Sequence, residues 1–349
     1  MSEDVIKLEH LWKIFGENAQ AAMEAIEARN LSKNQVLKEF KCVVGIADCS
    51  FSVRKGEVFC VMGLSGSGKS TMVRHLNRLI EPTAGFIEVL GRDMRALSDV
   101  DLRAMRAREI GMVFQHMALL PHRTVRDNVA FPLQIRGDSK ARRWEISQQC
   151  LNLVNLNGYE DRFPSELSGG MQQRVGLARA LASDPEVLLM DEPFSALDPL
   201  IRRQLQDQFM DLSRNLQKTT VFITHDLDEA IRIGHRIAIM KDGRIVQIGT
   251  PEEIVTQPAD DYVRDFVEGI SKLKLVYAHS IMVPIAQFKA VSSDDLSQSP
   301  KAHHGCDLDR LIDISTTTEH PIVIQDDDGN DIGVIDKTTL LKGIQGGKA

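Results

Sequence analysis

A glycine-rich stretch, "GLSGSGKST" at residues 63–71, carries the side chains best suited to chemistry in this chain. It fits the pattern G-x-x-x-x-G-K-[ST], whose glycines let successive backbone N–H groups turn toward one point and bind phosphate oxygens. Lys69 supplies a positive charge for the β- and γ-phosphates of a nucleotide, and Ser70 supplies a hydroxyl ligand for Mg²⁺. The helix that begins there adds the positive end of its dipole. The nucleotide-binding residues expected from this stretch are Gly63, Leu64, Ser65, Gly66, Ser67, Gly68, Lys69, Ser70 and Thr71.

Two neighbouring carboxylates follow a second apolar run, "VLLMDEP" at residues 187–193. Asp191 comes at the end of this predicted strand, where open α/β sheets place ligand-binding groups, and we expect it to hold Mg²⁺ directly or through water. Glu192 is suited to polarise a water that attacks the γ-phosphate, a role typically worth ~10²–10⁴ in rate. The alternative is that both acids only cap the next turn.

A second helix start has the composition of an anion-binding site. In "LSGGMQQRVGLARAL" at residues 167–181, Ser168 is the predicted N-cap, and Gly169 and Gly170 leave the first backbone N–H groups uncovered. An ordinary capped helix explains Ser168. It does not explain two glycines in the first turn, because each costs about 1 kcal/mol relative to alanine.

The elements that must position these groups alternate between strand and helix. The short apolar runs "EVFCVMG", "PEVLLMDEP" and "TTVFITHD" are typical of buried parallel strands, and a helix is expected from Lys69 to about Leu79. A helical insertion is expected near residues 17–40, and residues 97–157 are expected to be mostly helical. "RIAIMKDGRIVQIGT" predicts a hairpin that turns at Asp242 and Gly243. The pattern indicates an α/β sheet.

Bulk composition narrows the class of protein. Of 349 residues, 43% are hydrophobic and 26% are charged, which fits an ordinary soluble globular chain of two domains. The net charge of −7 argues against nucleic acid as the main partner. The five cysteines have irregular spacing without a CxxC pair, which predicts free thiols in a reducing cytosol. The charged amino terminus and the lack of a run of ~20 apolar residues predict neither a signal peptide nor a membrane span.

The character of the sequence changes after about Gly269. "SSDDLSQSPKAHHG" is polar and poorly periodic, and "PIVIQDDDGNDIGVIDKTTLLKGI" then predicts two strands around an acidic Asp-Gly turn and a final helix. We therefore predict one domain over residues 1–269 and a second, small α+β domain over residues 270–349.

Together the glycine-rich loop, "LSGGMQQ" and "VLLMDEP" resemble the nucleotide-binding subunit of ABC transporters, and the match covers roughly residues 6–268. The resemblance implies a P-loop NTPase fold with a helical subdomain near residues 97–180. It also implies an ATPase that uses ATP and Mg²⁺. The catalytic residues it implies are Lys69, Gln115, Glu192 and His225. The metal ligands it implies are Ser70, Gln115 and Asp191. Further ATP contacts are expected from Phe15, which would stack on adenine, and from Ser168, Gly169, Gly170, Asp198 and His225.

In this family one subunit's P-loop and the other subunit's signature enclose the same ATP, so the resemblance implies a head-to-tail dimer. It also implies an integral membrane permease as partner, a substrate-binding protein as indirect partner, and a peripheral place on the cytoplasmic face of the inner membrane. The apolar segment "HMALLPHRTVRDNVAFPL" is expected to line the groove for a permease helix, with Leu119 and Leu120 in contact.

The insertion near residues 17–40 and the run "FSALDPLIRRQLQDQF" are similar to the glycine betaine/proline/choline uptake group. The tail resembles a single degenerate cystathionine-β-synthase-type (CBS) module, which implies regulation; a plain dimerisation or docking domain is the alternative. Three other functions stay open at this point: an ABC ATPase of DNA repair or translation, an importer subunit for another solute such as an amino acid, and a P-loop kinase.

Overall fold

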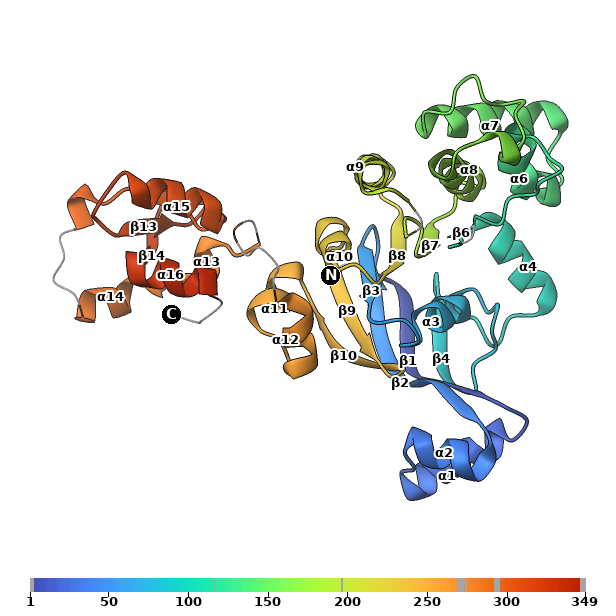
Figure 1. Cartoon of the computed structure of the whole chain (residues 1–349), viewed down its shortest axis with the longest axis horizontal. Coiled ribbons are helices and arrows are strands. Elements are labelled where there is room, and N and C mark those ends of the chain that lie inside the picture. Colours follow the sequence, from blue (N-terminus) through green and yellow to red (C-terminus); the bar gives the residue numbers. More distant parts are fainter. Residues whose placement is uncertain are drawn as a thin grey trace. The chain divides into compact units, whose positions relative to one another are not determined.

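The computed structural model describes residues 3–115, 117–195, 197–268, 273, 275–291 and 296–345 (Figure 1). The chain divides into two compact units, Met1–Ile248 (unit 1) and Gly249–Ala349 (unit 2). The elements that begin in unit 1 are β1 (Asp4–Phe15), α1 (Ala19–Arg29), α2 (Lys33–Phe40), β2 (Val43–Arg54), β3 (Val58–Met62), α3 (Lys69–Leu76), β4 (Ala84–Val89), β5 (Arg92–Asp93), α4 (Asp99–Arg108), β6 (Ile110–Val113), α5 (Val125–Val129), α6 (Phe131–Arg136), α7 (Lys140–Leu153), α8 (Gly169–Ala182), β7 (Val187–Asp191), α9 (Pro199–Leu216), β8 (Thr219–Thr224), α10 (Leu227–Ile233), β9 (Arg236–Lys241) and β10 (Arg244–Gly249).

Unit 1 is built on two sheets. The six-stranded sheet has the order β10-β9-β3-β8-β7-β6, and its pairs β3–β8, β3–β9, β7–β8 and β6–β7 are parallel. Every residue of β3, β7 and β8 is buried, which is why these strands appear in the sequence as short continuous apolar runs. The four-stranded sheet has the order β2-β1-β4-β5 and antiparallel pairing. The predicted α/β class is confirmed.

One hydrophobic core joins the two sheets of unit 1. Phe51 of β2 stacks on Phe59 of β3 with ring centroids 4.9 Å apart, and Met72 and Leu76 of α3 belong to the same buried cluster. Helix α3 therefore packs on the core with its amino-terminal end at the glycine-rich loop. This packing fixes the direction in which the loop's N–H groups point.

The predicted insertion forms the helix pair α1 and α2, which lies at the far end of the β1–β2 ribbon (Figure 1). Ser32 starts α2 with a capping box, because its hydroxyl accepts from Gln35 N while the Gln35 side chain accepts from Ser32 N. Met23 and Val36 are buried against Ile14 of β1, in a cluster of their own. The insertion is thus a folded part of unit 1.

Residues 97–157 are mostly helical, as the sequence predicts, and α6, α7 and α8 gather into a helical lobe (Figure 1). The strand β6 within this stretch was not predicted. Its four residues, "IGMV", follow the polar cluster "RAMRARE" and are too few to show a period. The predicted hairpin is confirmed: Asp242 and Gly243 have φ of 48° and 69°, as a type I′ turn requires.

Unit 2 combines helices with one mixed sheet of order β11-β14-β13-β12. Its elements are α11 (Pro251–Thr256), α12 (Asp261–Val267), α13 (Ala278–Ile281), β11 (Val283–Pro284), α14 (Ile285–Val291), β12 (Lys301–His303), α15 (Leu308–Thr316), β13 (Ile322–Gln325), β14 (Asp331–Ile335) and α16 (Lys337–Gln345). The strands around the acidic turn and the final helix lie where the sequence predicts them.

The compact units meet between Ile248 and Gly249, whereas the change in composition predicts a boundary after Gly269. Helix α11 has contacts with later residues: the Glu252 carboxylate accepts from Tyr277 N at 3.1 Å. This contact joins two residues 25 positions apart, so the local composition does not reveal it. Among the described residues, none of the helices has both the length and the apolar character that crossing a membrane requires.

Candidate functional site

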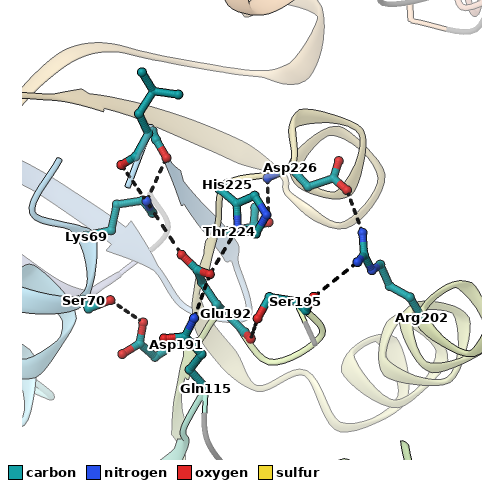
Figure 2. Close-up of polar contacts among 12 residues, drawn as sticks. Lys69, Ser70, Gln115, Asp191, Glu192, Ser195, Arg202, Thr224, His225 and Asp226 are labelled. Carbon is teal, nitrogen blue, oxygen red and sulfur yellow. Dashed lines mark hydrogen bonds and ion pairs between the residues drawn. The ribbon is translucent and has the colours of Figure 1, made fainter. Parts of the chain in front are cut away.

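The side chains selected from the sequence meet at one edge of the six-stranded sheet (Figure 2). Gly63 follows β3, Asp191 ends β7 with Glu192 directly after it, His225 follows β8, and Gln115 comes two residues after β6. Since β3, β8, β7 and β6 are parallel neighbours in that order, their carboxyl ends lie side by side. Four separate segments of chain thereby supply one site.

Lys69 is the cation of this site and is almost fully buried. Its ammonium donates to Gly63 O at 2.8 Å and Leu64 O at 3.1 Å, so the side chain curls back along its own loop. Burial lowers the pKa of Lys69, and the Glu192 and Asp191 carboxylates act in the opposite direction. A triphosphate beside the ammonium would favour its charged form in the same way.

The glycine-rich loop encloses a cavity of about 550 Å³. Gly68 has a φ of 103°, and a Cβ there would lie 2.7 Å from Gly45 O, so this close approach requires glycine. The buried Ser67 Oγ has no hydrogen-bond partner among the described residues, and Ser67 itself does not line the cavity. The cavity is lined by Gly45, Leu64, Ser65, Gly66, Gly68, Lys69, Ser70, Thr71, Gln115, Glu192 and His225.

An oxygen-rich set of side chains lies beside this cavity. Ser70 Oγ donates to Asp191 Oδ1 at 2.7 Å, and Arg74 Nη2 lies 3.3 Å from Asp191 Oδ2. The Asp191 side chain is fully buried, so its charge requires these partners. Hydroxyl, carboxylate and amide oxygens are the ligands that Mg²⁺ prefers, and the residues present fit that ion. Sequence reasoning missed Arg74, which lies outside the motif.

Glu192 is the centre of the polar network. Gln115 Nε2 donates to Glu192 Oε2 at 3.2 Å, His225 Nδ1 lies 3.1 Å from the same oxygen, and Lys69 Nζ lies 3.8 Å from Oε1. The next turn is closed by main-chain oxygen, because Ser195 Oγ donates to Glu192 O at 3.1 Å. Capping that turn is therefore not the task of the Glu192 carboxylate.

The predicted signature residues lie at the start of α8 and do not line the cavity. Ser168 is the N-cap, and its hydroxyl accepts from Met171 N at 3.4 Å. A Cβ on Gly170 would lie 2.7 Å from Ile201 Cγ2, so packing against α9 explains this glycine. A Cβ on Gly169 would meet open space, so packing does not explain the other one.

Asp198 also lies away from the cavity, at the N-cap of α9, and its side chain makes no capping hydrogen bond. Arg202, one turn into α9, fixes the preceding loop by donating to Ser195 O at 3.4 Å and Leu197 O at 3.3 Å. Ala196 of the "SALD" stretch lies outside the described residues. Asp198 is thus presented at the start of a helix whose loop is held in place.

Phe15 lies at the rim of the cavity, because it packs against Gly45, which lines the cavity. A Cβ on Gly45 would lie 2.7 Å from Phe15 Cε2, and Gly45 itself lines the cavity. The Phe15 ring is 40% exposed, and Lys13 Nζ lies 5.1 Å from its centroid. A half-open ring beside a phosphate-binding loop can stack on a base. Sequence reasoning missed Gly45; the signal was a glycine inside a strand pattern, which often marks close approach.

Comparisons with known proteins agree with this geometry. Residues 46–195 match the family described as "ABC transporter". The glycine betaine/carnitine transport ATP-binding protein GbuA of Listeria monocytogenes is 51% identical over 278 residues, which cover 80% of this chain and 70% of that protein. The trimethylamine N-oxide transport system ATP-binding protein TmoW of Pelagibacter ubique is 43% identical over 341 residues, with 98% and 97% covered. A dimeric post-hydrolysis structure of the ATP-binding cassette MJ0796, bound to ADP and Pi, aligns with a TM-score of 0.60 and 30% identity over 70% of this chain and 98% of that chain.

Proposed function

Because the chain belongs to the ABC transporter family, we propose that it is the ATP-hydrolysing subunit of an importer for quaternary amines and related methylated amines. The observation that best supports ATP hydrolysis is that Lys69, Gln115 and His225 all contact the Glu192 carboxylate at the edge of the phosphate-binding cavity. The solute class comes from the relatives, whose names give glycine betaine, carnitine and trimethylamine N-oxide. These solutes share a fully substituted nitrogen.

Hydrolysis follows from the placement of the side chains. Loop N–H groups and Lys69 bind the β- and γ-phosphates of ATP. Glu192 accepts a hydrogen bond from the attacking water, and His225 beside it contacts the γ-phosphate. Water attacks phosphorus as the bond to the β–γ bridging oxygen breaks, the Glu192 carboxylate takes a proton from that water, ADP leaves, and phosphate carries the new oxygen. When bound by Ser70, Asp191 and Gln115, Mg²⁺ would neutralise charge on the two phosphates.

The active unit we propose is a head-to-tail dimer. Ser168, Gly169, Gly170 and Asp198 do not line the cavity that holds Lys69 in the same chain. A second copy would bring its own α8 start to this cavity and close it over ATP. The similar MJ0796 cassette is dimeric in its structure with ADP and Pi, which supports this arrangement. Hydrolysis then loosens the pair, which makes ATP a switch between two states.

A membrane permease is the proposed mechanical partner, with this chain on the cytoplasmic face of the inner membrane and a substrate-binding protein on the other side. An apolar cavity of about 320 Å³ in unit 1, lined in part by Leu79, Phe114 and Phe131, fits an apolar helix. The segment predicted to form this groove supplies Ala118, Phe131 and Pro132, whereas the expected Leu119 and Leu120 are half-buried and do not line this cavity. We expect Leu79→Asp to abolish transport while ATP hydrolysis persists.

A matched control tests that groove. Leu37 of the insertion is 48% exposed and Leu79 is 49% exposed, so Leu37→Asp makes the same chemical change on a comparable surface. Uptake into vesicles that contain both subunits should survive Leu37→Asp. Equal uptake by wild type and Leu79→Asp would show that the permease docks elsewhere.

The carboxyl-terminal residues 270–349 are proposed to regulate transport as a single CBS-like module. The small sheet with helices in unit 2 supports a folded domain, and the full-length similarity to TmoW shows that a relative has a matching tail. Deleting residues 270–349 should change how ionic strength controls uptake. Unchanged salt control would favour the alternative, a dimerisation or docking domain without a regulatory role.

The function itself is tested with the purified chain and its permease in lipid vesicles. We expect ATP-dependent uptake of glycine betaine, choline, proline or trimethylamine N-oxide, measured with labelled solutes and an amino acid such as glutamine as control. Phosphate release without any acceptor excludes a P-loop kinase. ATP hydrolysis with uptake of the control alone would indicate another solute. Hydrolysis without a copurifying membrane protein would favour a repair or translation ATPase.

A further inference from the structure

Among the described residues, three side chains with metal-binding atoms meet at one edge of the sheet in unit 2. They are His303, His304 and Asp327, and one ligand atom of each lies within 4.8 Å of the other two. His303 Nε2 lies 2.9 Å and His304 Nε2 lies 3.3 Å from Asp327 Oδ1. This group lies wholly outside the nucleotide cavity.

From this geometry we propose that His303, His304 and Asp327 form a Zn²⁺ site with three protein ligands and an open fourth position. Ligand atoms about 2.0–2.2 Å from a tetrahedral Zn²⁺ lie about 3.3–3.6 Å from one another. The two nitrogen-to-oxygen distances require adjustments of a few tenths of an ångström to reach that range. Two imidazoles with one carboxylate select Zn²⁺ over Mg²⁺ or Ca²⁺, which prefer oxygen ligands.

The backbone holds the three ligands in position. Strands β12 and β13 are parallel, with His303 opposite Gln325, and His304 N donates to Gln325 O at 2.8 Å. The turn after β13 is closed by Asp326, whose Oδ1 accepts from Asp328 N at 3.0 Å and Asn330 N at 2.8 Å. This closed turn presents Asp327 toward the histidine pair.

The hydrogen bonds of His303 show which of its ring nitrogens carries the proton before and after metal binding. Gly305 N donates to His303 Nδ1 at 3.1 Å, so the neutral ring carries its proton on Nε2 and donates it to Asp327. When Nε2 gives its electron pair to Zn²⁺, the ring proton moves to Nδ1, and the Gly305 N–H loses its acceptor. The hydrogen bond from Nε2 to Asp327 and the hydrogen bond from Gly305 N to Nδ1 are thus both exchanged for the metal bond.

The test is a titration of the full-length protein with Zn²⁺ in excess Mg²⁺ and ADP, which keep the nucleotide site occupied. We expect one Zn²⁺ per chain and a rise in the melting temperature. Asp327→Asn and His303→Gln should each weaken binding at least about tenfold. Co²⁺ should give the visible absorption of a four-coordinate ion in wild type and lose it in both variants.

Two substitutions of the same chemistry act as controls. Asp328→Asn changes the next acid of the same turn, and His320→Gln changes an exposed histidine outside the cluster. Both should bind Zn²⁺ as wild type does. Equal binding by all four variants, or an absence of Zn²⁺ binding by folded wild-type protein in excess Mg²⁺, would overturn the proposal. Neither outcome bears on the ATPase, because the nucleotide cavity contains none of these residues.

Discussion

Glu192→Gln is the sharpest test of the proposed chemistry, because it keeps the size of the side chain and removes its charge. Its carboxylate has three neighbours: Gln115 Nε2 at 3.2 Å, His225 Nδ1 at 3.1 Å and Lys69 Nζ at 3.8 Å. The amide oxygen can still accept one hydrogen bond, so we expect the site to stay folded. A neutral amide cannot take a proton from water. Removing a general base costs ~10²–10⁴ in rate, which corresponds to about 3–5 kcal/mol of activation free energy.

Nucleotide binding should change in the opposite direction. Without the carboxylate, the Lys69 ammonium has no anion at Glu192 to compete with the phosphates, and the phosphates themselves favour its charged form. We therefore expect Glu192→Gln to bind ATP at least as tightly as wild type and to accumulate as a dimer, because ATP stays uncleaved. Phosphate release measures the rate, fluorescent-nucleotide titration measures binding, and size-exclusion chromatography with light scattering measures the dimer.

The control makes the same change at the opposite end of the same strand. Glu186 is exposed and immediately precedes β7, so Glu186→Gln should leave rate, binding and association as in wild type. If Glu192→Gln hydrolyses ATP at the normal rate, Glu192 is not the base. If the ATP-loaded variant stays monomeric even with the permease present, the proposed dimer is wrong.

Two further predictions concern the loop and the helix after it. Gly68 has a φ of 103°, and a new Cβ there would lie 2.7 Å from Gly45 O, so Gly68→Ala should abolish nucleotide binding and lower the free energy of unfolding by about 1–3 kcal/mol. The control is Gly91→Ala, at a φ of 71° in open space, which should still bind nucleotide. Burial lowers the pKa of His75, so the folded state keeps this ring neutral and loses stability as pH falls through the unfolded value of about 6.5. Between about pH 7.5 and about pH 5.5, the free energy of unfolding measured with urea should fall less in His75→Gln than in wild type. In the exposed control His122→Gln it should fall with pH as steeply as in wild type. Equal slopes in His75→Gln and wild type would remove His75 as a source of this pH dependence.

The sequence predicts the parts of the site that lie within short motifs. A buried strand leads directly into the glycine-rich loop, and another leads to Asp191 and Glu192. The local sequence pattern therefore places these residues at strand ends. Parallel pairing then brings them together, because the carboxyl ends of parallel strands share one edge of the sheet. Gln115 was named from a family resemblance, and the strand before it was not predicted. Strand β6 has only four residues and follows a polar stretch, so its sequence is too short to show the alternation expected of a strand.

The contributions that sequence analysis missed depend on three-dimensional contacts. Gly45 lines the cavity, the Phe15 ring lies where a Gly45 side chain would stand, and the Gly45 carbonyl oxygen lies where a Gly68 side chain would stand. Arg74 reaches Asp191 from a residue one turn into α3, beyond the end of the motif. No local pattern marks Arg74, whereas Gly45 is marked in the sequence as a glycine inside a strand pattern. Gly170 shows the converse, since a glycine assigned to anion binding also has a packing reason that only the neighbouring helix reveals.

The charges around the cavity are a physical reason for the proposal that a second copy of the chain completes the site. Lys69 and Arg74 lie against the carboxylates of Glu192 and Asp191, so the cations are already balanced by anions before a nucleotide arrives. Mg²⁺-bound ATP is still negatively charged, and backbone N–H groups add stabilisation beyond that of Lys69. The glycine-rich loop supplies one set. In the proposed dimer, the start of α8 at Gly169, where a side chain would meet open space, would bring a second set from the other copy to the same phosphate. Replacing Gly169 with aspartate would place a carboxylate at that helix end, and it should therefore weaken ATP-dependent dimerisation far more than ATP binding by the separated chains.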